Sequence, residues 1–206
     1  MTIIVTGASG KFGRLVTELL LQRVPAAELI LVTRNPGALA HLAARGAQVR
    51  HGDFDKPETL HAAFSGGERM LLISTLSVGR RAEQHIRAIN AAVHAGVNHI
   101  LYTSSGGAHP NNPAIVIPDH LGTERALKSS GVAFTIQRDS LYIEAPLWQI
   151  APRALASGKW VTSAGDGRVA FVAKKDCVAV AAAILTSPGH EGKTYEITGP
   201  DLLSFR

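Results

Sequence analysis

A glycine-rich stretch near the amino terminus reads Gly7-Ala8-Ser9-Gly10-Lys11-Phe12-Gly13. It follows an apolar run at residues 2–6 and precedes an amphipathic segment at about residues 11–23. A glycine-rich turn between a strand and a helix is a common cradle for phosphate groups. The Gly-Lys pair inside it fits two kinds of loop, one that binds a nucleoside triphosphate and one that binds a dinucleotide.

A triphosphate loop requires a glycine five residues before the glycine of the Gly-Lys pair, and Ser or Thr directly after the lysine. Here these two positions hold Val5 and Phe12. Both requirements fail, so the sequence argues against a triphosphate loop.

The dinucleotide interpretation gives each glycine of the G-x-x-G-x-x-G spacing a role. Gly7 makes the tight turn, Gly10 lets the backbone approach the pyrophosphate, and Gly13 lets the helix pack against the first strand. The first N–H groups of the helix then face the pyrophosphate. For Lys11 two alternatives stay open, since its charge lies either near the pyrophosphate or in solvent. The spacing is typical of short-chain and extended dehydrogenases.

Strand-like apolar runs alternate with helix-period segments through the first two thirds of the chain. The apolar runs lie at residues 2–6, 29–33, 47–50, 70–74, 98–103 and 132–137, and the helical segments at about 11–23, 36–45, 57–64, 80–95 and 119–130. Such alternation specifies a parallel sheet with helices on both faces. The predicted fold class is therefore a Rossmann-like, doubly wound α/β fold.

Arg34 directly follows the second predicted strand. Sites specific for NAD carry Asp or Glu near this point to bind the ribose hydroxyls, whereas NADP sites carry Arg to hold the 2′-phosphate. Arg34 therefore favours NADPH over NADH, and the alternative is a surface arginine that happens to follow a strand. After the third strand, Asp53 and Phe54 are predicted to face the adenine ring, and Asp55 to cap the helix that begins near Pro57.

Length and composition limit the other possibilities. A chain of 206 residues that is 46% hydrophobic can form one compact domain around a single core. Cys177 is the only cysteine, which excludes an intrachain disulfide and a multi-cysteine metal site and fits a reducing cytoplasm. The nine histidines form no H-E-x-x-H pattern and no serine stands in a G-x-S-x-G elbow, so no metal site and no hydrolase is predicted.

Charge and hydropathy argue against a nucleic acid or a membrane as partner. The net charge is +5, and apart from two basic pairs the Lys and Arg residues are scattered without interleaved aromatic residues. The longest apolar run, at residues 177–185, is about half a membrane span. A small anionic ligand explains the mild positive charge equally well.

From about residue 139 the alternation loosens into loop and turn signals. We expect one NAD(P)-binding domain over residues 1–206, with a dinucleotide-binding core at 1–138 and substrate-side cap elements at 139–206. A helix is predicted after Asp176 and a strand at about Thr194–Thr198. Residues 202–206 are predicted to begin another helix, with Ser204 as its cap.

Several segments together resemble the NmrA-like atypical short-chain dehydrogenases, over essentially the whole chain. Within that group the likeness is greatest to the type 2 NADPH:quinone oxidoreductases and the triphenylmethane reductases. The segments are Gly7–Gly13, Val32–Pro36, Val49–Phe54, Leu71–Thr75 and Gly189–Tyr195. The relatives have a longer helical C-terminal region, so this chain is expected to end before it.

The resemblance implies further cofactor-binding residues. Ser74, Thr75 and Leu76 would run beside the nicotinamide half, and Tyr102 ends the fifth strand at the same edge of the sheet. The segment from Arg138 to Tyr142 matches one that lines the nicotinamide and substrate pocket, where the family usually has Asn in place of Asp139; that carboxylate would need a partner, for which Arg138 is the candidate. The full predicted cofactor-binding set is Gly7, Ser9, Gly10, Lys11, Phe12, Gly13, Arg34, Asp53, Phe54, Ser74, Thr75, Leu76, Tyr102, Arg138, Asp139 and Tyr142.

The chain lacks the Tyr-x-x-x-Lys pair of short-chain alcohol dehydrogenases, because Tyr102, Tyr142 and Tyr195 are followed four residues later by Gly, Pro and Gly. Ketone reduction creates an alkoxide whose conjugate acid is about as weak as water, with a pKa of roughly 15.7, whereas quinone reduction gives a phenolate-like anion near roughly 10. A quinone therefore needs little proton assistance. The predicted activity is an NADPH-dependent oxidoreductase that passes a hydride to a quinone or a similar electron-accepting aromatic. His120 and Tyr142 are weak catalytic candidates.

The missing Tyr-Lys pair equally suits a protein that catalyses nothing. NmrA-like proteins include redox-responsive regulators, so a non-catalytic NADP(H)-binding sensor is the alternative hypothesis. The expected partner of an enzyme is a small-molecule electron acceptor, and a homodimer is a further hypothesis.

Overall fold

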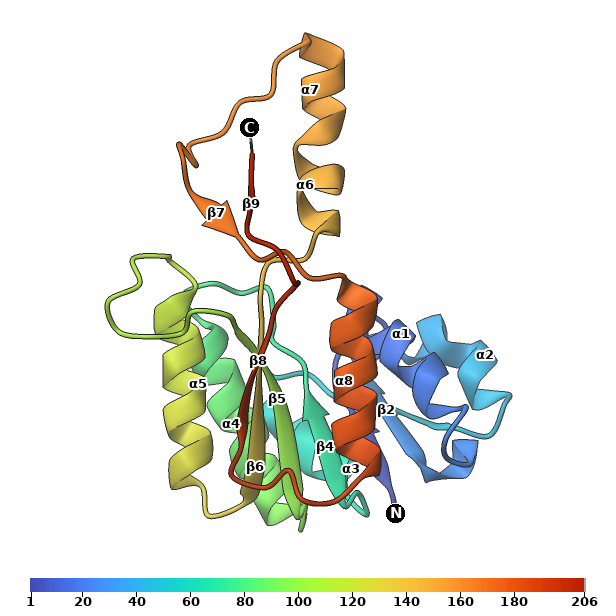
Figure 1. The fold of residues 1–206 in the computed structure, drawn as a ribbon. Coiled ribbons are helices and arrows are strands. Elements are labelled where there is room, and N and C mark those ends of the chain that lie inside the picture. Colours follow the sequence, from blue (N-terminus) through green and yellow to red (C-terminus); the bar gives the residue numbers. More distant parts are fainter. Residues whose placement is uncertain (206) are drawn as a thin grey trace.

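Seven parallel strands form one sheet in the order β3-β2-β1-β4-β5-β6-β8 (Figure 1). The computed structural model describes residues 1–205, with the backbone alone at residues 148 and 149. The strands are apolar runs with their residues in register across neighbours, as in the pairs of Ile4 with Ile30 and with Met70. Their bounds are β1 Ile3–Val5, β2 Leu29–Thr33, β3 Gln48–His51, β4 Arg69–Leu72, β5 His99–Ser105, β6 Ala133–Asp139 and β8 Thr194–Ile197.

Helices cover both faces of the sheet. Alternate strand residues point to opposite faces, so Ile3 and Val5 pack toward α1 and α8, whereas Ile4 packs toward α3 and α4. All three isoleucine and valine side chains are fully buried. The helices on one face are α1 (Lys11–Leu20), α2 (Ala40–Ala43) and α8 (Lys174–Thr186), and those on the other are α3 (Leu60–Phe64), α4 (Arg81–His94) and α5 (Ile117–Ser129). The predicted α/β fold class is confirmed.

Two short 3-10 helices begin segments that were predicted as α-helices, and a third leads into a strand. The segment predicted at 36–45 begins as η2 (Pro36–Leu39), and the one predicted at 57–64 begins as η3 (Pro57–Thr59), each with proline at its first position. η1 (Ala26–Glu28) leads into β2.

The sheet reverses its direction of winding between β1 and β4. From β1 the chain adds β2 and then β3 on one side, and it afterwards crosses back to add β4, β5 and β6 on the other. In open parallel sheets, ligands bind outside the carboxyl ends of the strands at such a reversal. The loops after β1 and β4 therefore flank the expected binding cleft.

A projecting segment rises from the carboxyl edge of the sheet, away from the two helical layers (Figure 1). It consists of α6 (Glu144–Gln149), α7 (Ala151–Ser157) and the antiparallel pair β7 (Arg168–Val169) and β9 (Leu203–Ser204). The predicted helix at residues 202–206 is wrong, because Leu203 and Ser204 pair with Val169 and Arg168 as a strand; Arg206 lies outside the described residues.

Two elements of the region predicted as a cap belong to the core. The strand predicted at 194–198 is β8, which extends the main sheet beside β6, and α8 packs against that sheet with Cys177 and Ala181 fully buried. The predicted cap region therefore does not include α8 and β8, and a substrate-side role of the projecting segment stays a prediction. Among the described residues, no helix has both the length and the apolar character needed to cross a membrane.

Candidate functional site

The glycine loop joins β1 to α1 and is folded tightly on itself. Gly7 has a φ of +58°, a left-handed conformation that favours glycine, and its carbonyl oxygen accepts the N–H of Gly10 at 2.9 Å. A Cβ on Gly13 would lie 2.4 Å from the Gly7 oxygen and 2.7 Å from the Cα of Ala8. Gly13 thus allows the helix to pack against the turn itself, rather than against the first strand as predicted. The loop is a cradle that a single methyl group would fill.

The amino end of α1 is open toward the loop. Gly10 is the N-cap residue, no side chain caps the helix, and its first turn contains no acidic residue. The exposed Lys11 begins the helix. Unpaired N–H groups and a positive helix end favour an anion at this position. The residues present therefore fit a pyrophosphate.

Three hydrogen bonds that the sequence did not suggest hold the loop in place. The hydroxyl groups of Ser9 and Thr33 lie 2.8 Å apart and tie the loop to the end of β2. Arg14 donates from Nε to the Ser9 carbonyl at 2.9 Å and from Nη2 to the Ala38 carbonyl at 3.3 Å. Phe12 is buried and its ring stacks on Tyr142 with 6.5 Å between centroids, so only its backbone faces the loop.

Arg34 lies exposed at the end of β2, next to the glycine loop. Its guanidinium makes no hydrogen bond or ion pair with any residue in the described part of the chain. Arg14, in contrast, is occupied by two carbonyl groups. Arg34 is therefore the arginine at this end of the cleft that is free to bind a phosphate.

The loop after β3 is held by local contacts. An oxygen of Asp53 accepts the N–H of Asp55 at 3.0 Å, and Phe54 packs edge-on against His85. Asp55 does not cap a helix as predicted, because its carboxylate pairs with Arg80 at 2.8 Å and accepts a hydrogen bond from Gln84 at 3.0 Å.

The loop after β4 contains Ser74, Thr75 and Leu76. The Ser74 N–H donates to the Thr103 hydroxyl at 2.9 Å, and all three polar groups of Thr75 have protein partners. The Leu76 side chain is 95% exposed. Leu76 is therefore the apolar side chain that this loop exposes. The hydrogen bonds of Thr75 hold the loop in place.

Two predictions about the helix-covered face are wrong. Tyr102 is fully buried beneath α4 and α5, and its hydroxyl lies 2.7 Å from Nδ1 of His120, so its ring cannot contact a cofactor. His120 is 5% exposed and its Nε2 lies 2.8 Å from Nη1 of Arg81. It is enclosed by protein groups and cannot touch a substrate in this arrangement.

The hydrogen bonds of this buried cluster fix the protonation of both its histidines. Arg81 can only donate, so Nε2 of His120 accepts and its Nδ1 carries the proton. The Thr75 N–H likewise donates to Nε2 of His85, whose Nδ1–H then donates to the Thr123 hydroxyl. Burial, with Arg81 as a second cause, lowers the pKa of His85 to about 3 and that of His120 to about 4. Both rings are therefore neutral at pH 7.

These neutral histidines make folding sensitive to acid. In the unfolded chain both titrate near their ordinary pKa of 6.5, so below that pH the unfolded state binds more protons and stability falls as pH is lowered. Each pKa unit corresponds to about 1.4 kcal/mol, so His85 alone is expected to cost about 3 kcal/mol between pH 7 and pH 4. Glutamine keeps an acceptor and a donor but does not titrate, so the free energy of unfolding of His85→Gln should fall by about 3 kcal/mol less over that range. Urea unfolding at several pH values measures this. The same acid loss in wild type and variant would contradict this, and the exposed His94→Gln serves as control.

Arg138 and Asp139 point to opposite faces of β6 and do not pair. Arg138 makes a two-pronged ion pair with the buried Glu124, at 2.9 and 2.7 Å, and a further one with Glu196. Burial acts to raise the pKa of Glu124, but hydrogen bonds from Arg138 and Ser104 outweigh it and hold that pKa below its usual range. The Arg138 guanidinium therefore joins β6 to Glu124 on α5 and to Glu196 on β8.

The buried Asp139 and the half-buried Tyr142 form a second pair near the glycine loop. The Tyr142 hydroxyl donates to Asp139 at 2.8 Å, and Gln137 donates to the other carboxylate oxygen at 2.8 Å. Burial raises the pKa of Asp139, and burial together with the Asp139 charge raises the pKa of Tyr142. The Lys174 ammonium lies over the Tyr142 ring, 5.1 Å from its centroid, whereas the Tyr142 hydroxyl donates to Asp139.

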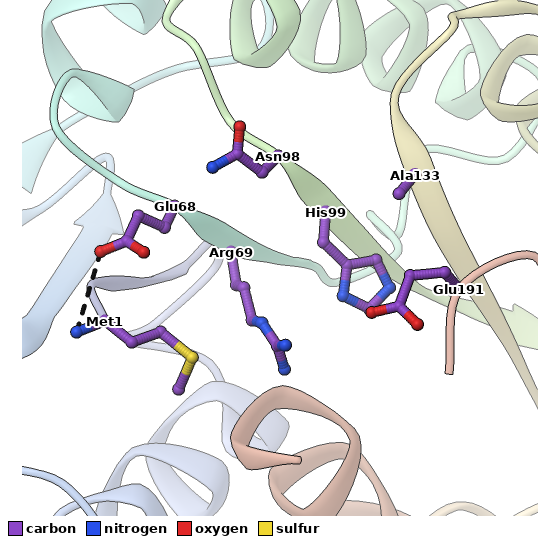
Figure 2. Close-up of a pocket in the computed structure, with 7 residues that line it drawn as sticks. All are labelled: Met1, Glu68, Arg69, Asn98, His99, Ala133 and Glu191. Carbon is purple, nitrogen blue, oxygen red and sulfur yellow. Dashed lines mark ion pairs between the residues drawn. The ribbon is translucent and has the colours of Figure 1, made fainter. Parts of the chain in front are cut away.

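Two cavities of about 330 Å³ each lie outside this cleft. The first is at the amino ends of β4 and β5, where Arg69 donates to three carbonyls at the carboxyl end of α8 (Figure 2). None of the predicted site residues lines it. The second is apolar and lies in the projecting segment, among Ile143, Leu147, Trp160, Phe171, Leu203 and Phe205.

Comparisons of the sequence and of the fold with known proteins both find NAD(P)H-binding proteins. A family profile described as NAD(P)H-binding matches residues 7–188. Quinone oxidoreductase 2 of Escherichia coli (strain K12) is 42% identical over 197 residues, which are 96% of this chain and 68% of that protein. A crystal structure of the NADPH-dependent quinone oxidoreductase QOR2 from Escherichia coli, complexed with NADPH, superposes with a TM-score of 0.92 at 41% identity, covering 98% of this chain and 70% of that one. Triphenylmethane reductase of Citrobacter sp., complexed with NADP(H), gives 0.91 at 36% identity, covering 100% and 72%.

Proposed function

The chain belongs to the NAD(P)H-binding family, and from this we propose that it is an NADPH-dependent oxidoreductase that reduces quinones or similar electron-accepting aromatics. The observation that carries the proposal is the glycine cradle, in which Gly13 has no room for a Cβ and α1 begins without a side-chain cap. Two structures of relatives support NADPH as the cofactor. The QOR2 structure is complexed with NADPH, and the triphenylmethane reductase structure is complexed with NADP(H).

The protein's residues supply binding and orientation. The loop amides and the amino end of α1 hold the pyrophosphate, and Arg34 holds the 2′-phosphate. Because Arg34 lies on the β2 side of the reversal, the loop after β4 would hold the nicotinamide half of a bound cofactor. The reduced nicotinamide supplies the hydride when the cofactor is bound.

The proton chemistry of the site suits a quinone better than a ketone. Tyr142 donates its hydroxyl proton to Asp139 and its pKa is raised, so it is a weak acid in this fold. A phenolate-like product, with a pKa near roughly 10, is stable enough to take its proton from water, whereas an alkoxide near roughly 15.7 is not.

The rival function is an NADP(H)-binding redox sensor that catalyses nothing. The burial of His120 favours it, because one of the two catalytic candidates cannot reach a substrate. The two functions differ in turnover, because only the enzyme oxidises NADPH when an acceptor is added.

We expect the protein to oxidise NADPH when a small quinone is added, and to leave NADPH unchanged when a simple aliphatic ketone is added. The assay follows the absorbance at the NADPH band with a panel of quinones and ketones. Acceptors from the two classes are compared at matched reduction potentials where such pairs exist. Tight NADPH binding without any acceptor-dependent oxidation would reject the enzyme and favour the sensor. Equal rates with quinones and ketones would reject the argument from proton chemistry.

Three further expectations are proposals of the same kind. Residues 1–206 are proposed to act as one NAD(P)-binding domain, in a reducing cytoplasm as the single buried Cys177 suggests. A homodimer is proposed because the projecting segment carries exposed apolar side chains, among them Leu147, Leu155 and Val161.

A further inference from the structure

Every polar group of Thr75 is held by one turn of α4. The Thr75 N–H donates to Nε2 of His85 at 3.1 Å, its hydroxyl donates to Oε1 of Gln84 at 2.8 Å, and its carbonyl accepts from Nε of Arg81 at 2.6 Å. We call Arg81, Gln84 and His85 the Thr75 clamp. All three are at most 5% exposed. The clamp leaves Thr75 no rotamer or backbone freedom that does not break a buried hydrogen bond.

Arg81 is the unusual member of the clamp, because it is a buried cation. Its second contact is with the neutral ring of His120, at 2.8 Å from Nη1, and the ion pairs of the described residues do not include it. Burying a charge without an opposite charge is costly, and an apolar side chain of similar length often replaces such a group without loss of stability. What an apolar side chain cannot supply are two donors in fixed directions.

The clamp is itself anchored on α5. The Nδ1–H of His120 donates a hydrogen bond to the hydroxyl of the buried Tyr102, and Asp119 accepts the N–H groups of Gly79 at 2.6 Å and Ala82 at 3.3 Å. The start of α4 and the end of the loop are thus fixed to a second helix. The loop at residues 73–80 is held from behind, while Leu76 on its other side stands in solvent.

Gln84 also connects the two ends of the cleft. Its Nε2 donates to Asp55 in the loop after β3 at 3.0 Å, while its Oε1 accepts from Thr75 in the loop after β4. Because both its amide nitrogen and its amide oxygen are hydrogen-bonded, the Gln84 side chain has only one orientation that satisfies both bonds. The loop on the adenosine side and the loop on the nicotinamide side therefore share one rigid bridge.

We propose that Arg81 is a positioning residue for hydride transfer. Through the Thr75 carbonyl it fixes the loop against which the nicotinamide half lies, and thereby the distance between the reduced ring and the acceptor. The proposal rests on the proposed function, because it needs a cofactor in the cleft. Misplacing the reacting groups by about 1 Å costs about 100-fold in rate, so a loosened loop should reduce turnover strongly while the phosphate contacts still hold the cofactor.

The experiment compares Arg81→Met with Arg45→Met in the full protein. Arg45 has an exposed side chain that pairs with Glu18, far along the chain from the loop after β4. Arg81→Met is expected to lower kcat for a small quinone at least about tenfold, with the Kd for NADPH within about threefold of wild type. Arg45→Met is expected to keep kcat within about twofold.

Rescue and exchange measurements separate positioning from a general loss of structure. Guanidinium ion added to Arg81→Ala should restore part of kcat, and the same ion should not raise kcat of Arg45→Ala. Hydrogen exchange of the Thr75 N–H should be at least about tenfold faster in Arg81→Met than in Arg45→Met. This exchange measurement needs no turnover, so it tests the clamp even if wild type oxidises no NADPH and the proposed function fails.

Two results would overturn the proposal. One is a folded Arg81→Met with wild-type kcat or with unchanged Thr75 exchange. The other is a parallel fall of kcat, NADPH affinity and melting temperature without rescue by guanidinium, which would make Arg81 a residue of stability alone.

Discussion

Replacing Gly13 with alanine is expected to weaken NADPH binding at least about 100-fold, which corresponds to about 2.7 kcal/mol. The new Cβ would lie 2.4 Å from the Gly7 oxygen and 2.7 Å from the Ala8 Cα, and both atoms are backbone that cannot rotate away. The turn must therefore open, which moves the amides that face the pyrophosphate. Titration of the cofactor, followed by its fluorescence or by calorimetry, measures the change.

Gly37→Ala is the matched control for this substitution. It lies in the neighbouring turn, and a Cβ there would meet only the Asn35 side chain, at 3.5 Å. We expect its NADPH affinity to stay within about threefold of wild type. A folded Gly13→Ala, with an unchanged circular dichroism spectrum and wild-type affinity, would contradict the assignment of this loop to the pyrophosphate.

Replacing Arg34 with alanine is expected to weaken NADPH binding about 10- to 100-fold and to leave NADH binding within about threefold. Arg34 makes no hydrogen bond or ion pair in the described part of the chain, so its removal breaks no internal contact. Hydrogen bonds to a charged group are each worth about 1.5–3 kcal/mol, and only NADPH has the 2′-phosphate to accept them. Parallel titrations with the two cofactors give the ratio.

Arg45→Ala controls for the loss of one positive charge, because Arg45 lies on the surface and pairs with Glu18. It should change the affinities for NADPH and NADH little and equally. Equal losses of both cofactors in Arg34→Ala would show that Arg34 does not read the 2′-phosphate.

The sequence predicted the fold and the phosphate loop because both depend on local patterns. Strand–helix alternation and a G-x-x-G-x-x-G turn at the first junction are short-range signals, and each local choice agrees with the global fold. The place of Arg34 after the second strand follows from the same topology, and its contact with the 2′-phosphate stays a prediction.

Side-chain direction was predicted less well. The strands of a parallel sheet are apolar on both faces, so nothing in β5 indicated that Tyr102 points beneath α4 and α5 rather than into the cleft. The expected pairing of Arg138 with Asp139 fails for a simpler reason, because successive residues of a strand point to opposite faces of the sheet. The two side chains therefore find separate partners, Glu124 for Arg138 and Tyr142 for Asp139.

Long-range contacts account for the remaining differences. The strand at Leu203–Ser204 exists because Arg168 and Val169, far earlier in the chain, offer a partner edge. The Thr75 clamp is equally invisible in the sequence, because its hydrogen bonds join residues of the loop, α4 and α5 whose spacing follows no motif.

A single-turnover experiment tests hydride transfer in this cleft most directly, with the protein saturated with NADPH and mixed with one equivalent of a small quinone. We expect the absorbance of the reduced nicotinamide to fall in step with the appearance of one equivalent of hydroquinone, much faster than in a mixture without protein. Bound NADPH that persists unchanged in the presence of every quinone tested would contradict the central claim that this cleft transfers a hydride.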